Sequence, residues 1–384
     1  MKMTIKKPTK PSSNTLWFLL FYDVVLAAAF GQTTHFYSEH PTWAVMGFVL
    51  LCNLFLYLMW MLTSLDLITN TKNNVGQKLF GLIQIVSLSL AAIALGWDSS
   101  LSYVWGFLSL AVSVASLIGL IAASEQRAYA RSIIPGLAIT TVLFGAGAVL
   151  SLQGSFAPER WAIPLIALGL AVMTISTLTS GSKRFAYENN ISAHDLQERF
   201  GMLLLIILGE AFIVLVDSLA VAGSIPQPAF FVLSIVVVFA IWLLYFPHLA
   251  QFSRPQTLSR TVSHFGAHFL LVMCSANAAA AYASQTLIHQ DFTFEDWGSD
   301  DWTAIPLVFI LLAIMWLQYL DSPQWSTVQT VHAVSAAVMV GLVIASEANN
   351  SVWGGMSLAV SALVLLADAI VVYLIQSRQR QITH

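Results

Sequence analysis

Carboxylates stand inside apolar runs that are long enough to cross a lipid bilayer. Glu210 lies near the centre of the run "ERFGMLLLIILGEAFIVLVDSLA" (198–220), and Asp217 follows two helical turns later on the same face. Asp23 takes a similar place in "WFLLFYDVVLAAAFGQTTH". An ionised, unpaired carboxylate at the centre of a bilayer costs roughly 2.5–3.5 kcal/mol on insertion scales. Such a group therefore fits a proton-exchanging site in a carrier or, as the alternative, a protonated group whose hydrogen bonds hold helices together.

Three further charged residues are candidates: Asp368 lies inside the run Val352–Ile375, some eight residues from its inner end, and Glu198 and Arg199 lie at the start of another run. Asp368 is another candidate for proton or substrate binding, and contact with a cytoplasmic partner such as Arg378 is its alternative role. Glu198 and Arg199 form a pair of adjacent charged residues, a charged step, directly before the apolar run 200–221 begins. Glu198 suits the positive end of a helix dipole, and the long Arg199 side chain can extend to lipid phosphate. We therefore predict that this pair fixes the depth of the helix, with gating as the alternative.

Two histidines, His264 and His268, stand four residues apart and so share one face of a helix. Imidazoles at this spacing can share a zinc or copper ion, but a metal site needs at least a third ligand. The sequence has no His-Glu-x-x-His motif, no Cys-x-x-Cys motif and no histidine-rich loop. We predict no metal and expect structural histidines. The alternative is a proton- or substrate-binding role that relays protons to Glu210.

The elements that must position these residues are transmembrane helices. Only 9% of the 384 residues are charged, whereas a soluble domain has about 25% charged residues. A spanning helix needs about 20 apolar residues, and no strand-like alternation competes with the apolar runs. We therefore predict an all-α integral membrane protein with about twelve transmembrane helices. The runs are Leu16–Phe36, Trp43–Leu65, Leu79–Trp97, Leu101–Ala123, Ile133–Leu152, Trp161–Ser180, Phe200–Val221, Phe230–Phe252, Val262–Ile288, Trp302–Leu320, Val328–Ser346 and Val352–Ile375.

The basic residues predict the orientation of these helices. With twelve spans and both termini in the cytoplasm, Arg160 alone among the 16 Lys and Arg residues falls outside. Basic residues concentrate in cytoplasmic loops, so this asymmetry supports the topology. The acidic loop "HQDFTFEDWGSDDW", which has no Lys or Arg, then lies outside. We expect a multi-pass protein of the cytoplasmic (inner) membrane.

Weak internal similarity suggests two parallel repeats of six helices. Sliding the second half over the first places Asp23 near Glu210 and Phe80-Gly81 beside Phe265-Gly266. Chance similarity between apolar helices is the alternative. Parallel repeats occur in some secondary transporters. The predicted organisation is a basic cytoplasmic tail (1–15), a first half (16–182), a cytoplasmic linker (183–198), a second half (199–376) and a cytoplasmic tail (377–384).

Two of these segments resemble a known family. "WFLLFYDVVLAAAFGQTTH" and "ERFGMLLLIILGEAFIVL" are similar to the signature segments of the bacterial low-temperature-requirement A family. Tyr22 and the "DVV" that follows depart slightly from the Phe-Phe-Asp-Leu-Val type of start in that family. Length, span count and the placement of both segments agree, so the resemblance covers essentially the whole chain. The family is named for a cold-growth phenotype. The resemblance implies a multi-helix fold and a membrane location, and it supplies no substrate.

The function that these features favour is secondary transport of a small solute, with proton coupling through Asp23 and Glu210. No Walker A motif, Gly-rich dinucleotide turn, nucleophile motif or basic patch occurs, so we expect no cofactor and no nucleic-acid partner. Membrane lipids and an unknown small molecule are the expected partners, and an oligomer is left open. An intramembrane enzyme acting on a lipid or isoprenoid carrier is the first alternative. A non-catalytic stress-adaptation or assembly factor is the second.

Overall fold

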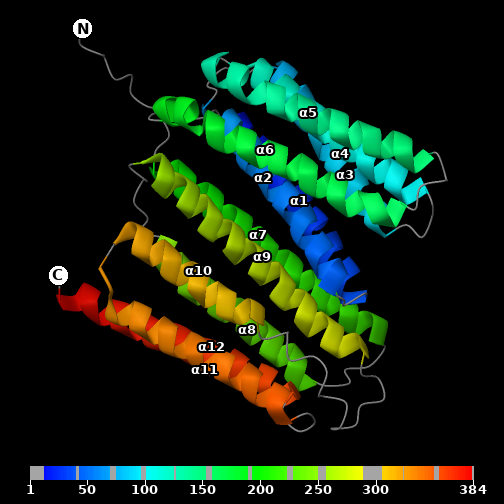
Figure 1. Cartoon of the computed structure of the whole chain (residues 1–384). Coiled ribbons are helices and arrows are strands. Elements are labelled where there is room, and N and C mark those ends of the chain that lie inside the picture. Colours follow the sequence, from blue (N-terminus) through cyan, green and yellow to red (C-terminus); the bar gives the residue numbers. More distant parts are fainter. Residues whose placement is uncertain are drawn as a thin grey trace. The chain divides into compact units, whose positions relative to one another are not determined.

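A computed structural model describes residues 13–39, 43–69, 75–96, 101–124, 127–152, 158–188, 193–222, 228–249, 257–288, 305–322, 324–349 and 354–382. Every regular element in these ranges is an α-helix, as the sequence predicts. The helices are α1 (Ser13–Glu39), α2 (Trp43–Thr69), α3 (Val75–Leu95), α4 (Leu101–Ala122), α5 (Arg127–Leu152), α6 (Pro158–Glu188), α7 (Ala193–Ala222), α8 (Pro228–Leu249), α9 (Leu258–Ile288), α10 (Ile305–Asp321), α11 (Thr327–Asn349) and α12 (Gly354–Ile382). Figure 1 shows these helices along the chain.

Local sequence explains where several helices begin. Pro158 and Pro228 each occupy the first position of a helix, where the missing N–H of proline breaks no helical hydrogen bond. Helix α11 begins with a capping box. The Gln329 backbone N–H donates to Ser326 Oγ at 3.2 Å, and the Ser326 backbone N–H donates to Gln329 Oε1 at 2.9 Å. These contacts satisfy backbone donors that the first turn of a helix leaves unpaired.

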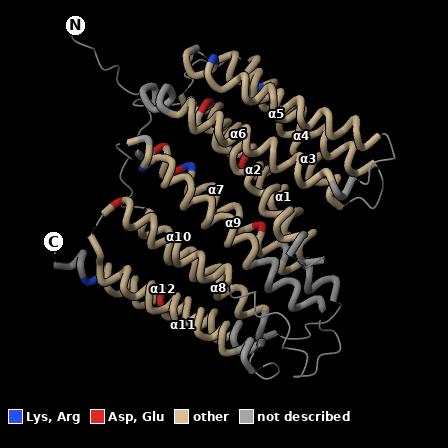
Figure 2. Tube along the Cα trace, viewed as in Figure 1, with Lys and Arg blue, Asp and Glu red and all other residues tan. Residues whose placement is uncertain are grey.

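The surfaces of the helices suit lipid. Over the described residues, nine helices are long and apolar enough to cross a membrane, and α10, with 17 residues, is a shorter apolar helix. Large apolar side chains such as Trp17 and Val142 are 69% and 70% exposed. Figure 2 shows that the described helices are almost free of charged residues along most of their lengths. A lipid environment stabilises such surfaces, whereas water would promote their association.

The helices extend beyond the apolar runs that the sequence defines. Helix α5 begins at Arg127 and passes through Pro135, and α6 begins at Pro158 and passes through Pro164. Helix α6 ends at Glu188 and α7 begins at Ala193, so most of the segment 183–198 is helical. Hydropathy marks only the lipid-embedded part of a helix, and polar turns can continue it into the interface. This difference matters for the site, because buried ionisable residues lie in such extensions.

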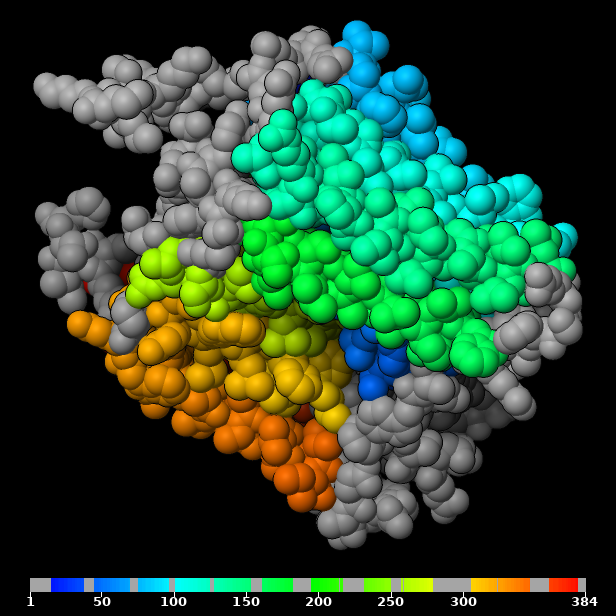
Figure 3. Space-filling model, turned by 45° about the horizontal axis from the view of Figure 1, so that its top comes forward, coloured from blue at the N-terminus to red at the C-terminus, as the bar shows by residue number. Residues whose placement is uncertain are grey.

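The first compact unit, Met1–Leu203, contains α1–α6 and the first part of α7. Helix α3 packs on α4, α4 on α5, and α5 on α6, while α1 contacts α2 and α3, and α2 contacts α6. Figure 3 shows α5 and α6 side by side on the surface of this unit. Close packing depends on glycine: a Cβ added at Gly169 of α6 would lie 2.5 Å from the ring of Phe144 on α5. Small residues commonly allow such approach between membrane helices.

The second compact unit, Leu204–His384, contains the rest of α7 and α8–α12. Its packing partners are α9 with α10, α10 with α11, α11 with α12, α8 with α9, α10 and α12, and α10 with α12. A shift of six helices relates the first six of these pairs to pairs in the first unit, where α3, α4, α5 and α6 pack in order and α2 contacts α3, α4 and α6. The boundary between the units falls inside α7.

Candidate functional site

Asp23 of α1 lies in the first unit, and its side chain is fully buried. The Arg199 guanidinium donates through Nη2 to Asp23 Oδ1 at 2.5 Å, forming an ion pair. The indole Nε1–H of Trp60 donates to the same oxygen at 2.8 Å. An unpaired carboxylate at this depth would be costly, and two donors, one of them cationic, offset that cost. The pair therefore explains how Asp23 is accommodated in an apolar helix.

Three helices build this ion pair. Asp23 comes from α1, Arg199 from the first part of α7, and Trp60 and Ser64 from consecutive turns of α2, four residues apart. Arg199 Nη2 also lies 3.2 Å from Ser64 Oγ, to which it donates. The Arg199 guanidinium carbon is 6.0 Å from the centre of the Trp60 ring, at the limit of a cation–π contact. Phe200 of α7 packs against Trp60, with the two ring centres 6.0 Å apart.

Arg199 does not extend to lipid phosphate, and that expectation is wrong. The residue is only 6% exposed, and its guanidinium points to Asp23. The physical reason is that a buried carboxylate without a counterion is costly, and Arg199 is the cation that packing brings to Asp23. Its sequence neighbour Glu198 is exposed. The two residues of the charged step therefore point into different environments, and a role for Glu198 in anchoring the helix stays a prediction.

Further buried polar side chains lie on α2 and on α3, which contacts α1 and α2. Thr63 of α2 donates through its hydroxyl to Gln84 Oε1 of α3 at 2.9 Å. Among the described residues, the buried polar atoms without a hydrogen-bond partner include Asp23 Oδ2, Gln84 Nε2 and Arg199 Nε. Buried polar atoms are nearly always paired, so open ones point to water or a bound polar molecule. We call the set Asp23, Trp60, Ser64, Gln84 and Arg199 the Asp23 cluster.

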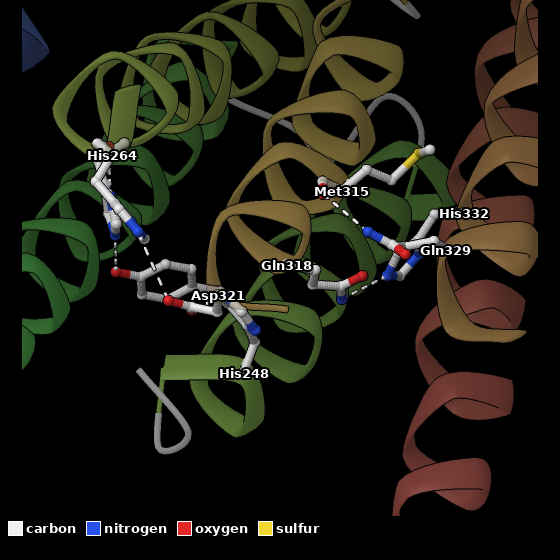
Figure 4. A network of polar contacts seen from close by, with 9 residues as sticks. His248, His264, Met315, Gln318, Asp321, Gln329 and His332 are labelled. Carbon is white, nitrogen blue, oxygen red and sulfur yellow. Dashed lines mark hydrogen bonds and ion pairs between the residues drawn. The ribbon is translucent and has the colours of Figure 1, made fainter. Parts of the chain in front are cut away.

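A second polar cluster, the Asp321 cluster, lies in the second unit around Asp321 at the end of α10. Its carboxylate oxygens lie 3.3 Å from His248 Nε2 of α8 and 3.6 Å from His264 Nε2 of α9 (Figure 4). His268 continues the cluster. Its Nδ1 lies 2.8 Å from the carbonyl oxygen of His264, and its Nε2 lies 2.9 Å from the Tyr245 hydroxyl. A carbonyl only accepts, so Nδ1 carries the hydrogen and Tyr245 donates to Nε2.

A third cluster joins α10, α11 and α12. His332 Nδ1 lies 2.6 Å from Asp368 Oδ2, and Ser335 donates through Oγ to Asp368 Oδ1 at 2.7 Å. On the opposite side of the imidazole, Gln318 Nε2 lies 3.0 Å from His332 Nε2 (Figure 4). His332 and Asp368 are 0% and 2% exposed. The expected alternative partner of Asp368, Arg378, has an exposed side chain, and Asp368 is held by His332 and Ser335.

The structure describes the remaining candidate residues from the sequence in less detail. Glu210 lies in α7 and is half-buried, and the side chain of Asp217 is outside the described residues. His264 and His268 are buried and lie in the Asp321 cluster. A proton relay from these histidines to Glu210 stays a prediction. Within the described part of the chain, no group of three His, Cys, Asp or Glu residues is suited to hold a metal ion.

Sequence reasoning missed several residues of these clusters. Asp321 and Asp66, which is fully buried in α2, each directly follow an apolar run of the sequence. The runs end before both residues because hydropathy falls at a charge. The position of these residues could have revealed them. An acidic residue directly after an apolar run still belongs to the helix if no Gly or Pro intervenes. Trp60 and Gln318 are not ionisable, so the cost of a charge in the membrane gives no signal at either position.

Long apolar helices that bury ionisable side chains define a multi-pass, all-α membrane protein. The family model of the bacterial low temperature requirement A protein (LtrA) matches residues 16–375, nearly the whole chain. The chain belongs to this family and is a polytopic bacterial membrane protein. No curated protein and no solved structure matches the chain.

Proposed function

We propose that this protein is a secondary transporter of a small polar solute in the cytoplasmic membrane, with solute movement coupled to protons. The observation that carries the proposal is the buried ion pair between Asp23 and Arg199. Ionisable residues in membrane helices are costly and typically mark substrate or proton pathways. A purely structural link between α1, α2 and α7 would be cheaper to build from apolar side chains, because a buried ion pair adds little net stability.

The ion pair gives a simple means of coupling. While Asp23 is ionised, it holds Arg199 and so ties α1 to the first part of α7. A proton on Asp23 removes the negative charge and weakens that tie. Arg199 is then available to a solute, and the helices that met at the pair are able to separate. Proton binding and solute binding therefore favour the same state, which is the condition for coupling.

The open hydrogen-bonding atoms of the Asp23 cluster favour one class of solute. Gln84 Nε2 and Arg199 Nε are donors, and among the described residues both are without a partner. Protonation of Asp23 would free Arg199 Nη2 as a third donor. Donors of this kind bind a solute rich in acceptor oxygens, such as a carboxylate, and guanidinium binds carboxylate with two parallel hydrogen bonds. We therefore propose a small organic acid or amino acid as the solute.

The proposal includes the topology and the internal repeat. The distribution of Lys and Arg supports cytoplasmic termini. The correspondence between the packing partners of the two units, with a shift of six helices, supports two parallel repeats.

A ligand screen followed by transport tests this proposal. The purified protein in lipid nanodiscs is heated in the presence of organic acids, amino acids, sugars or polyamines, since a bound solute raises the unfolding temperature. We expect stabilisation by one carboxylate-bearing class, and uptake of that solute by proteoliposomes. Arg199→Lys keeps the charge but removes the planar fork, and it should weaken binding at least tenfold. Absence of stabilisation and uptake for every class would contradict the proposal and favour a lipid-modifying or assembly role.

A further inference from the structure

We propose that His332, Asp368 and Gln318 form a proton-binding site in the second unit, in addition to the Asp23 cluster of the first. The three residues come from α11, α12 and α10, and they form one hydrogen-bonded line from carboxylate to imidazole to amide. The inference concerns proton binding by the protein alone. It therefore holds or fails without any reference to a solute.

The contacts define the form of the site in which His332 is neutral. Asp368 Oδ1 accepts from the Ser335 hydroxyl, and Oδ2 accepts from His332, so Nδ1 of the imidazole carries its hydrogen. Nε2 then has a lone pair, and it accepts from the Gln318 amide nitrogen at 3.0 Å. In this form the buried group carries one negative charge, on Asp368. The carboxylate has two donors, as a buried anion requires.

The same residues can also hold a proton on His332 Nε2. An imidazolium would donate at both nitrogens, to Asp368 on one side and toward Gln318 on the other. If the side-chain amide of Gln318 rotates by half a turn, Oε1 takes the place of Nε2 beside His332. Among the described residues, this Oε1 has no hydrogen-bond partner. The amide then accepts from Nε2–H. One proton is taken up, the Gln318–His332 hydrogen bond reverses its direction, the contacts of Asp368 are kept, and the buried group becomes a neutral imidazolium–carboxylate pair.

Charge favours proton uptake at this position. A lone carboxylate among lipid-embedded helices is costly, and a cation in hydrogen-bond contact removes its net charge. The Arg378 side chain of α12 is exposed, and His248 of α8 contacts Asp321, so neither replaces His332 as the partner of Asp368. The other titratable side chains described on α10, α11 and α12, and on α8, which packs on α12, are Tyr245, His248, Tyr319, Asp321, Tyr373 and Arg378.

The Asp321 cluster lies beside the site, at the end of α10. Gln318 and Asp321 lie one turn apart on α10, and Asp321 is the last residue of that helix. Figure 4 shows the two contact groups side by side, with Asp321 near His248 and His264, and Gln318 near His332. In the proposed topology this helix end faces the cytoplasm. Protons would therefore reach His332 from the cytoplasmic side.

Nitrogen NMR of the histidine rings tests the site directly. The full-length protein is labelled with ¹⁵N-histidine, placed in lipid nanodiscs and titrated with acid and base, with no solute present. The signals of His332 are assigned by their loss in His332→Gln. We expect a neutral ring with hydrogen on Nδ1 at high pH and an imidazolium at lower pH. A ring that stays neutral until the protein unfolds would overturn the inference.

Variants separate a proton site from a merely structural contact. In Asp368→Asn the imidazolium loses its counterion, and the proton affinity of His332 should fall at least tenfold. In Gln318→Leu the Nε2–H loses its acceptor, and the affinity should fall about tenfold, because a hydrogen bond to a charged group is strong. Asp368→Glu should restore most of the affinity. If folded Asp368→Asn bound a proton at His332 with the same affinity as the native protein, the proposal would be contradicted. This holds whatever the outcome of the transport experiment.

Discussion

At the scale of single residues, the structure shows how a charge is tolerated inside an apolar helix. Asp23 is held by a guanidinium from α7 and an indole from α2, and it is fully buried. A sequence shows that Asp23 must be compensated, because its cost follows from its depth. It does not show by what, since Arg199 is 176 positions away. The partner emerges only when tertiary packing brings α1 and α7 together.

Removing one partner of this ion pair should lower the stability of the protein more than removing both. Asp23→Asn leaves a buried guanidinium without its counterion, so we expect a loss of about 3–5 kcal/mol in stability. The double variant Asp23→Asn with Arg199→Gln has no buried charge and should recover most of that loss. Thermal unfolding in detergent, followed by circular dichroism, measures both.

The matched control for this comparison is Arg131→Gln. Arg131 is exposed on α5, so its change should be within about 0.5 kcal/mol. If Asp23→Asn were as stable as this control, the ion pair would not be what accommodates Asp23.

At the scale of helices, hydropathy predicts the number and approximate place of the elements but not their ends or their partners. Each of the twelve predicted runs overlaps a helix of the structure. Their ends differ because polar turns at 183–188 and 193–199 continue α6 and α7 into the interface. The pairing of His332 with Asp368 could not be predicted either. It depends on the rotation of α11 and α12 about their axes, and apolar sequence on all faces leaves that rotation undefined.

Glycine packing provides a prediction at this scale. In Gly169→Ala the new Cβ would lie 2.5 Å from the ring of Phe144. Phe144 is fully buried and stands between Phe55 and Phe107, with ring centres 5.8 and 6.5 Å away, so the ring has little room to move. We expect a loss of about 1–3 kcal/mol from overpacking. Gly145→Ala is the matched control, because nothing lies within 4 Å of its added Cβ. Equal unfolding temperatures for the two variants would show that α5 and α6 do not pack this closely.

At the scale of the whole molecule, the topology is the prediction on which the direction of transport depends. With both termini in the cytoplasm, the loop 290–300 lies outside, and the connection between α10 and α11 lies inside. The native Cys52 and Cys274 are first replaced by alanine, so that only an introduced thiol reacts. Intact cells should then label Ser299→Cys with a membrane-impermeant maleimide and should leave Ser322→Cys unlabelled. The reverse pattern would invert the orientation.

The central claim is that solute movement through this family member is coupled to protons at Asp23, and proteoliposomes test it most directly. The vesicles contain the solute class found by the ligand screen on the outside and a pH-sensitive dye inside, and an inward proton gradient is imposed. Native protein should accumulate the solute and acidify the lumen, and collapse of the gradient should stop accumulation. The double variant Asp23→Asn with Arg199→Gln, at matched abundance and stability, should do neither. Solute accumulation that is equal with and without the gradient, or equal in the double variant, would contradict the account.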